Sequence, residues 1–334
     1  MLDANLLLYG VLALILAAEF VNGWTDSPNA IATVVSTRVL SPYQALIMAT
    51  VLNAVGAMSG TAVAATVGKD IVSADVINLT TVAAAMVAII LWSTLAWYYG
   101  LPTSESHALI ASLTGAGLAT AGPSSLLWTG WSKVLIGLVF STFLGFFGGL
   151  LLMAVLYRSL ANSRPGTVRR TFGRLQILSA GFMAFSHGSN DGQKFIGVFT
   201  LALMLGGILP SFQVPIWVIL LCAVTMGVGT AIGGWRIVKT MGLRLTKLEP
   251  VHGFAAETAA ALTIELATRL GIPLSTTHTI NTAIVGVGAT RRFSAVRWGV
   301  TFEIVTAWIL TFPVCGLIGW GTTKLLLMLT AAWP

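Results

Sequence analysis

Charged residues are scarce in this chain. Of its 334 residues, 9% are Asp, Glu, Lys or Arg and 56% are hydrophobic, whereas a soluble domain carries roughly 25% charged residues. The shortage excludes a soluble globule, a disordered chain and a nucleic-acid-binding protein. Short segments of alternating polarity are also lacking, which excludes a transmembrane β-barrel. The long apolar runs that are present predict an all-α polytopic membrane protein embedded in a lipid bilayer.

Cysteine is nearly absent as well. Cys222 and Cys315 both lie inside apolar runs and are expected to be buried thiols acting as small hydrophobic residues. The sequence has no disulfide framework and no zinc-ligand spacing. We therefore expect no cofactor and no firmly bound metal.

Ten apolar segments form two groups of five. About 20 residues suffice to cross the hydrocarbon core of a bilayer. The two longest segments, 6–38 and 175–208, are interrupted by polar stretches, which predicts broken helices. Segments 104–121 and 276–290 are short enough to form parts of re-entrant hairpins. The remaining segments lie at 43–66, 78–99, 128–157, 213–232, 251–268 and 297–328.

A basic linker at 158–174 separates the two groups. It divides the chain into an N-terminal membrane repeat, 1–157, and a C-terminal one, 175–334. With one crossing per segment, the linker and two further basic stretches, 236–247 and 291–297, fall on the same side. The positive-inside rule assigns that side to the cytoplasm. An odd number of segments per half predicts an inverted-topology repeat.

Two motifs recur in the same order in both halves. Asn22-Gly-Trp-Thr-Asp26 corresponds to His187-Gly-Ser-Asn-Asp191, and Pro102-Thr-Ser-Glu-Ser-His107 corresponds to Pro273-Leu-Ser-Thr-Thr-His278. Repeats of this kind are typical of transporters whose binding site lies near the membrane midplane, between the halves.

The repeated carboxylates, Asp26 and Asp191, predict a cation or proton site, because a charge inside a bilayer persists only with a partner or in a cavity. Neutral oxygen and amide groups beside them belong to Asn22, Asn29, Asn190 and Gln193. Such groups suit a small hard cation or an oxyanion, and Asp26 with Asn29 is a candidate sodium site. Glu257, in a stretch of small residues, is a further candidate for proton or cation coupling.

The hydroxyl clusters predict the complementary anion site. Each follows a proline, which is tolerated in the first turn of a helix, and free N–H groups at a helix start attract anions. The cluster members are Ser104, Ser106, Ser275, Thr276 and Thr277. For His107 and His278, which end the motifs, a proton relay and a structural contact across the repeat axis both stay open.

These paired motifs resemble the signature of the inorganic phosphate transporter (PiT) family over essentially the whole chain. The resemblance implies secondary active phosphate uptake by symport with protons or sodium, at a site between inverted halves. The ending Gln193-Lys194 is similar to bacterial low-affinity members, which implies proton coupling and, for some members, uptake of a metal–phosphate complex. A bacterial plasma-membrane location and a homodimer are further expectations from this resemblance.

Other functions stay open at this point. They are sodium-coupled phosphate symport, a permease for another oxyanion such as sulfate, and a passive channel. An intramembrane hydrolase using Ser104 and His107 is disfavoured, because the chain has no Gly-x-Ser-x-Gly motif. Retained carboxylates favour phosphate over sulfate, because protonated phosphate can donate a hydrogen bond to them.

Lys194 follows Asp191 by three residues, a spacing that brings both side chains to one helix face. We predict that its ammonium is a tethered cation beside Asp191, in the place of a sodium ion. Two alternatives are an anchor that reaches the membrane interface and a direct ligand of phosphate.

Overall fold

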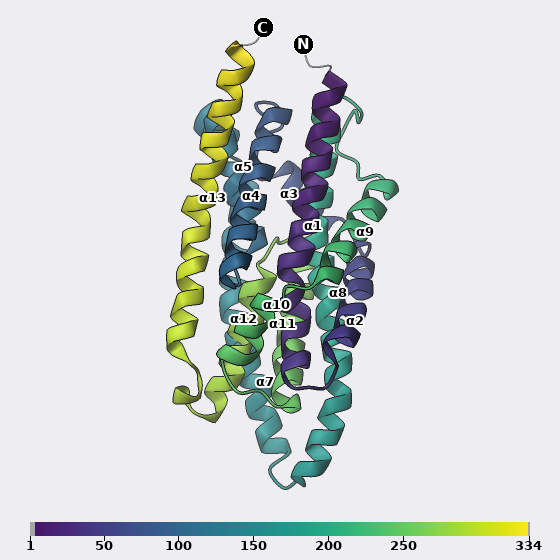
Figure 1. The fold of residues 1–334 in the computed structure, drawn as a ribbon, viewed down its shortest axis with the longest axis vertical. Coiled ribbons are helices and arrows are strands. Elements are labelled where there is room, and N and C mark those ends of the chain that lie inside the picture. The colour runs from purple at the N-terminus through teal and green to yellow at the C-terminus, as the bar shows by residue number, and fades with distance from the viewer. Residues whose placement is uncertain (1–3, 333–334) are drawn as a thin grey trace.

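The computed structural model describes residues 4–332, which form an elongated helical bundle with both chain ends at the same end of the molecule (Figure 1). Within the described residues, the only β-type pairing is an isolated bridge between Val72 and Leu126. The all-helical class predicted from the composition is therefore confirmed.

Five helical units make up the first half of the chain. They are α1 (Ala4–Ser36), α2 (Pro42–Ala57) with α3 (Ala62–Lys69), α4 (Leu79–Tyr99), α5 (Glu105–Ala121), and α6 (Trp128–Val139), which continues through the π-helical turn η2 (Phe140–Leu144) into α7 (Gly145–Ser159). A 3-10 turn, η1 (Gly122–Ser125), precedes α6.

Five corresponding units make up the second half. They are α8 (Pro165–Leu205), α9 (Ile216–Ile232) with α10 (Trp235–Lys239) and the π-helical η3 (Thr240–Arg244), α11 (Pro250–Arg269), α12 (Thr276–Arg291), and α13 (Trp298–Ala332), which follows the 3-10 turn η4 (Phe293–Ala295). Residues 158–174 form the end of α7, a short turn and the first turns of α8, so most of the predicted linker is helical.

Among residues 4–332, four helical stretches are long and apolar enough to cross a membrane: Asn5–Ser36, Leu79–Tyr99, Trp128–Ser159 and Trp298–Leu329. Two bent units qualify when each is taken as one span. The α2–α3 unit bends by 69° and the unit from α9 to Arg244 bends by 60°. The protein is thus a multi-pass membrane protein in which both bends occur in corresponding units of the two halves.

The prediction that segments 6–38 and 175–208 are broken helices is wrong, because α1 and α8 are continuous. In α1, Pro28 has no N–H to donate to the Trp24 carbonyl. Ser27 Oγ donates to that carbonyl at 3.1 Å and also accepts from Gly234 N at 2.8 Å. Helix α1 therefore continues past Pro28, because the Ser27 hydroxyl replaces the missing backbone donor.

Glycines allow the two halves to interlock through matching close contacts. A Cβ on Gly23 of α1 would overlap the Met226 carbonyl oxygen of α9, and a Cβ on Gly188 of α8 would overlap that of Asn53 in α2. Gly23 corresponds to Gly188 in the repeated motif. The first helix of each half therefore packs on the second unit of the other half.

The fourth and fifth units also pack across the two halves. A Cβ on Gly115 of α5 would overlap the Gly316 carbonyl oxygen of α13, and a Cβ on Gly286 of α12 would overlap that of Phe146 in α7. Gly115 and Gly286 follow the histidines of the second repeated motif at equal distance. The repeat is thus present in the packing as well as in the sequence.

The first helices of the two halves run in opposite directions. Leu8 near the start of α1 lies against Gly206 at the end of α8, whereas Val39 beyond the end of α1 lines a hollow with Arg169 near the start of α8. Figure 1 shows α1 descending from the N-terminal end while α8 rises from the opposite end. This arrangement agrees with the predicted inverted topology.

Two apolar clusters lie toward the two ends of the bundle, with the polar motifs between them. In α1, residues 8–18 belong to one cluster and residues 30–34 to the other. In α8, residues 195–203 and 180–184 divide in the same way. The motif residues therefore lie at the middle depth of the protein.

The predicted basic side is also present. Lys247 lines a hollow with Arg291, Arg292 and Arg297, and Arg291 lines a second hollow with Arg169. The basic stretches therefore gather at the end opposite the chain termini.

A single methyl group tests the close approach of α8 and α2. We expect Gly188→Ala to lower the melting temperature of the detergent-purified protein, because its Cβ would overlap the Asn53 carbonyl and overpacking costs about 1–3 kcal/mol. Gly173→Ala is the matched control, because it lies on the same helix with no atom within 4 Å of its Cβ position. Equal melting temperatures for the two variants would contradict this account of the crossing.

Candidate functional site

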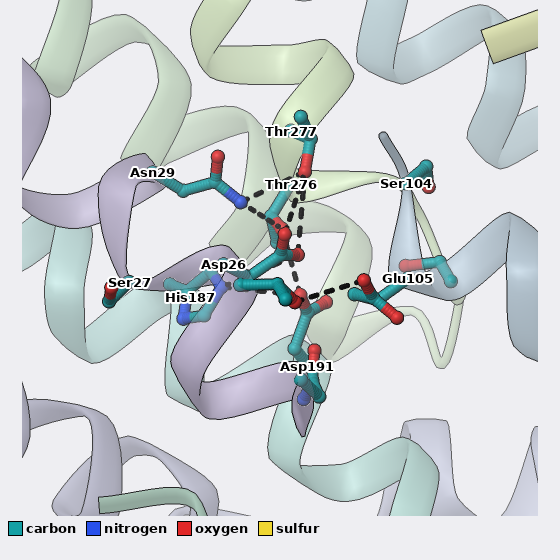
Figure 2. Close-up of polar contacts among 12 residues, drawn as sticks. Asp26, Ser27, Asn29, Ser104, Glu105, His187, Asp191, Thr276 and Thr277 are labelled. Carbon is teal, nitrogen blue, oxygen red and sulfur yellow. Dashed lines mark hydrogen bonds and ion pairs between the residues drawn. The ribbon is translucent and has the colours of Figure 1, made fainter. Parts of the chain in front are cut away.

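Asp26 of α1 and Asp191 of α8 lie close together in the centre of the bundle, with His187 between them (Figure 2). His187 Nε2 is 3.3 Å from Asp191 Oδ2 and 4.0 Å from Asp26 Oδ2. On the other side of the ring, His187 Nδ1 lies 3.1 Å from Asn53 Oδ1. Because the Asn53 amide group donates to Thr230, its oxygen accepts the Nδ1 proton, and Nε2 is directed at the carboxylates.

The hydroxyls at the start of α12 contact both carboxylates. Thr276 Oγ1 donates to Asp191 Oδ2 at 2.9 Å, and Thr277 Oγ1 lies 3.4 Å from Asp26 Oδ2. Asn29 Nδ2 donates to Thr277 Oγ1 at 2.9 Å and to Thr276 Oγ1 at 3.3 Å. Figure 2 shows Asn29 reaching these hydroxyls from α1. Both aspartates thus share one hydroxyl-lined site.

Lys194 contacts Asp191, as the spacing of three residues predicts. Its ammonium donates to Asp191 Oδ1, to Ser106 Oγ, and to the Leu274 carbonyl oxygen at 2.9 Å. The side chain is 2% exposed, so the alternative of an anchor at the membrane interface is wrong.

The starts of α5 and α12 face this site. Ser104 caps α5 and accepts from His107 N at 3.2 Å, and Ser275 caps α12 and accepts from His278 N at 3.1 Å. The first N–H groups of a helix have no partner within the helix, and the positive end of the helix dipole attracts anions. The predicted helix starts are therefore confirmed, with Ser104 and Ser275 acting as caps.

His107 and His278 contact each other across the repeat. Their rings are T-shaped with centroids 4.6 Å apart, and Trp308 stacks on His278 at 3.7 Å. Neither ring nitrogen of either histidine has a hydrogen-bond partner within the described residues. The contact is the one expected of a structural pair, although it is made by the ring faces and edges and not by a hydrogen bond.

The side chains of four predicted site residues bind partners other than the two aspartates. Asn190 Nδ2 donates to Thr268, and Gln193 Oε1 accepts from Val63 N. Asn22 Nδ2 donates to Glu19 at 3.3 Å. Glu257 lies between α1, α8 and α11, where it accepts from the side chains of Thr33, Gln176 and Ser179. In this structure the amides of Asn190 and Gln193 are thus engaged with neighbouring segments.

Two central residues received no firm role from the sequence. His187 takes the position of Asn22 in the repeat and precedes Asp191 by four residues, a spacing that places both on one helix face. This spacing could have identified it. Glu105, at the start of α5, accepts from Thr25 Oγ1 at 3.0 Å and from Ser93 Oγ at 2.6 Å. The two residues that donate to Glu105 lie on other helices, so no local sequence pattern predicts these contacts.

The central residues are closed to solvent in this structure, since Asp26 is 4% exposed and the others are more deeply buried. Asp26, His187 and Asp191 offer ligand atoms within 4.8 Å of one another, a set that could hold a cation. Both Asp191 oxygens already accept hydrogen bonds, whereas the Asp26 carboxylate makes, among the described residues, longer contacts to Thr277 and His187. Asp26 is therefore the more open carboxylate.

Comparison with solved structures supports the fold. The chain resembles a structure described as the sodium-dependent phosphate transporter, with a TM-score of 0.81 and 24% identity over 96% of this chain and 99% of the other.

Comparison with characterised sequences identifies bacterial relatives. The chain is 45% identical over 322 residues to a probable low-affinity inorganic phosphate transporter of Rhizobium meliloti, covering 95% of this chain and 96% of the relative. It is 40% identical over 307 residues to a protein of the same description from Bacillus subtilis, covering 91% and 92%. These relatives are named as transporters, in agreement with the prediction that the chain is not an enzyme.

The family model matches the chain twice, at residues 22–167 and 158–319. The two matches correspond to the two halves seen in the sequence motifs and in the helix packing. By this match and by its bacterial relatives, the chain belongs to the phosphate transporter family.

Proposed function

We propose that this protein imports inorganic phosphate across the bacterial plasma membrane by symport with protons. The observation that carries this proposal is the meeting of two helix starts, α5 and α12, with Asp26, His187 and Asp191 at the middle of the bundle. The helix starts supply N–H groups and hydroxyls for an oxyanion. The carboxylates supply acceptors for a protonated oxyanion and a place for the coupling cation.

The carboxylates favour phosphate over sulfate. Phosphate near neutral pH carries a proton that it can donate to Asp26, whereas sulfate has no proton and would be repelled. The names of the relatives point to the same substrate.

Charge balance requires a coupling cation. Moving one negative charge into a negative-inside cell costs about 2.3 kcal/mol per 100 mV. Of the two repeated aspartates, Asp191 is already paired with Lys194, whereas Asp26 has no ammonium partner. A proton taken up at Asp26, whose carboxylate lies 4.0 Å from His187 Nε2, would neutralise this carboxylate while the site is occupied. When that proton crosses the membrane together with a phosphate monoanion, the transport step moves no net charge.

A second form of the substrate is a complex of phosphate with a divalent metal. Asp26 and His187 offer an oxygen and a nitrogen to such an ion, and the Asn53 contact fixes the ring so that Nε2 faces it. The metal in this case is cargo that travels with phosphate.

The first test concerns the substrate. In proteoliposomes we expect arsenate to compete with labelled phosphate and sulfate to leave uptake unchanged, because only protonated tetrahedral anions can donate to Asp26. Uptake is measured with and without Mg²⁺. Competition by sulfate equal to that by arsenate would reject the phosphate assignment, and uptake that needs Mg²⁺ would identify the metal complex as the substrate.

The second test concerns the coupling proton. We expect an imposed pH gradient to drive accumulation without sodium, and Asp26→Asn to abolish this accumulation, because an amide cannot take up the proton. Asp75→Asn is the control, since Asp75 is exposed. Accumulation driven by a sodium gradient alone would show that the coupling ion is sodium.

The third test concerns the hydroxyls. We expect Thr277→Val to reduce phosphate uptake, because it removes the hydroxyl shared by Asn29 and Asp26, and one net hydrogen bond contributes about 0.5–1.5 kcal/mol. Thr279→Val is the matched control on the same helix, since its hydroxyl donates only to the Ser275 carbonyl. Equal uptake by both variants, at equal amounts of protein in the membrane, would remove Thr277 from the site.

A further inference from the structure

We propose that Lys194 is a built-in cation that permanently fills one of two equivalent cation sites, so that only the site at Asp26 takes up a mobile cation. This inference rests on the proposed cation-coupled transport and adds which half of the repeat carries out the coupling.

The ammonium of Lys194 fits an oxygen cage. Its three contacts are a carboxylate oxygen of Asp191, the hydroxyl of Ser106 and the carbonyl of Leu274. Ser106 donates its own proton to the Leu274 carbonyl at 2.8 Å, so its oxygen can only accept from Lys194. All three partners are acceptors, and three acceptors require the three donors of a charged ammonium.

The same contacts argue against a direct role in binding phosphate. An ammonium has three N–H donors, and all three are used within the protein. The side chain is also buried, so it is not free to reach another ligand without breaking its bonds to Asp191 and Ser106.

The repeat provides the comparison site. Asn29 follows Asp26 by three residues, as Lys194 follows Asp191. Asn29 Nδ2 donates to Thr277, which takes the position of Ser106 in the second motif. The contact to the hydroxyl of the second motif thus recurs in the first half, with a neutral amide in place of the ammonium, so position 29 supplies no fixed positive charge near Asp26.

The oxygens around Lys194 are the kind that a sodium ion binds. A carboxylate, a hydroxyl and a backbone carbonyl are hard oxygen ligands suited to a hard cation. With lysine replaced by asparagine, these oxygens would face a space without a positive charge, and Asp191 would keep Thr276 and His187 as neighbours but lose its ammonium partner. Lys194 therefore determines that the second half needs no mobile cation.

Lys194→Asn tests this inference in proteoliposomes. We expect phosphate uptake by this variant to fall roughly 100-fold or more without sodium, because removing the charged partner of a buried carboxylate is strongly unfavourable, and to recover when sodium is added. The wild type and a Lys133→Asn control, in which the lysine replaced is partly exposed, should be indifferent to sodium. Uptake by Lys194→Asn that stays normal without sodium would overturn the inference.

A binding measurement separates this inference from the proposed function. We expect sodium to raise the melting temperature of detergent-purified Lys194→Asn but not that of the wild type. The melting temperature can be measured without transport, so it tests the inference even if the wild type fails to accumulate phosphate. Failure of the wild type to accumulate phosphate would reject the proposed function alone. Lost uptake that sodium does not restore, together with no sodium-dependent stabilisation, would overturn the inference.

The reciprocal change, Asn29→Lys, provides a second variant. It would place an ammonium beside Asp26 and fill both sites. We expect this variant to lose accumulation driven by a pH gradient, because both aspartates of the repeated motif would then be paired with an ammonium. Retained coupling to the pH gradient would contradict the assignment of the mobile cation to Asp26.

Discussion

A carboxylate in the interior of a membrane protein must have a partner, and the partners of Asp191 organise the centre of this molecule. Lys194 and His187 come from the same helix, whereas Thr276 comes from the start of α12. Through Lys194, Ser106 at the start of α5 joins the same network. One buried charge thus fixes the positions of two helix starts from different halves, and these helix starts are the feature best suited to binding an oxyanion.

The repeat is symmetric in its backbone and asymmetric in its charges. The glycine crossings match between the halves, yet Lys194 corresponds to Asn29 and Glu105 corresponds to Thr276. In the proposed scheme, the duplicated scaffold supplies two places for a cation, and the difference between Lys194 and Asn29 decides which of them the protein fills itself.

The sequence predicted the helical class, the repeat and the contact between Lys194 and Asp191, because composition and spacing of three or four residues are local signals. It did not predict that α1 is continuous at Pro28, since the hydroxyl that replaces the lost donor is held by Gly234. The hydrogen-bond partners of Glu257 could not be predicted either, because Thr33, one of them, lies 224 positions away in the sequence. Such contacts depend on how helices pack, which no local pattern records.

The exchange of helices between the halves restricts how the closed site can open. α13 packs against α5 and α7 packs against α12, in both cases with glycines that bring backbones into contact. Packed interfaces of this kind do not deform continuously. Each rigid unit that moves must therefore contain helices from both halves of the sequence. The starts of α5 and α12, which contact Lys194 and Asp191, therefore belong to packed units that combine the two halves.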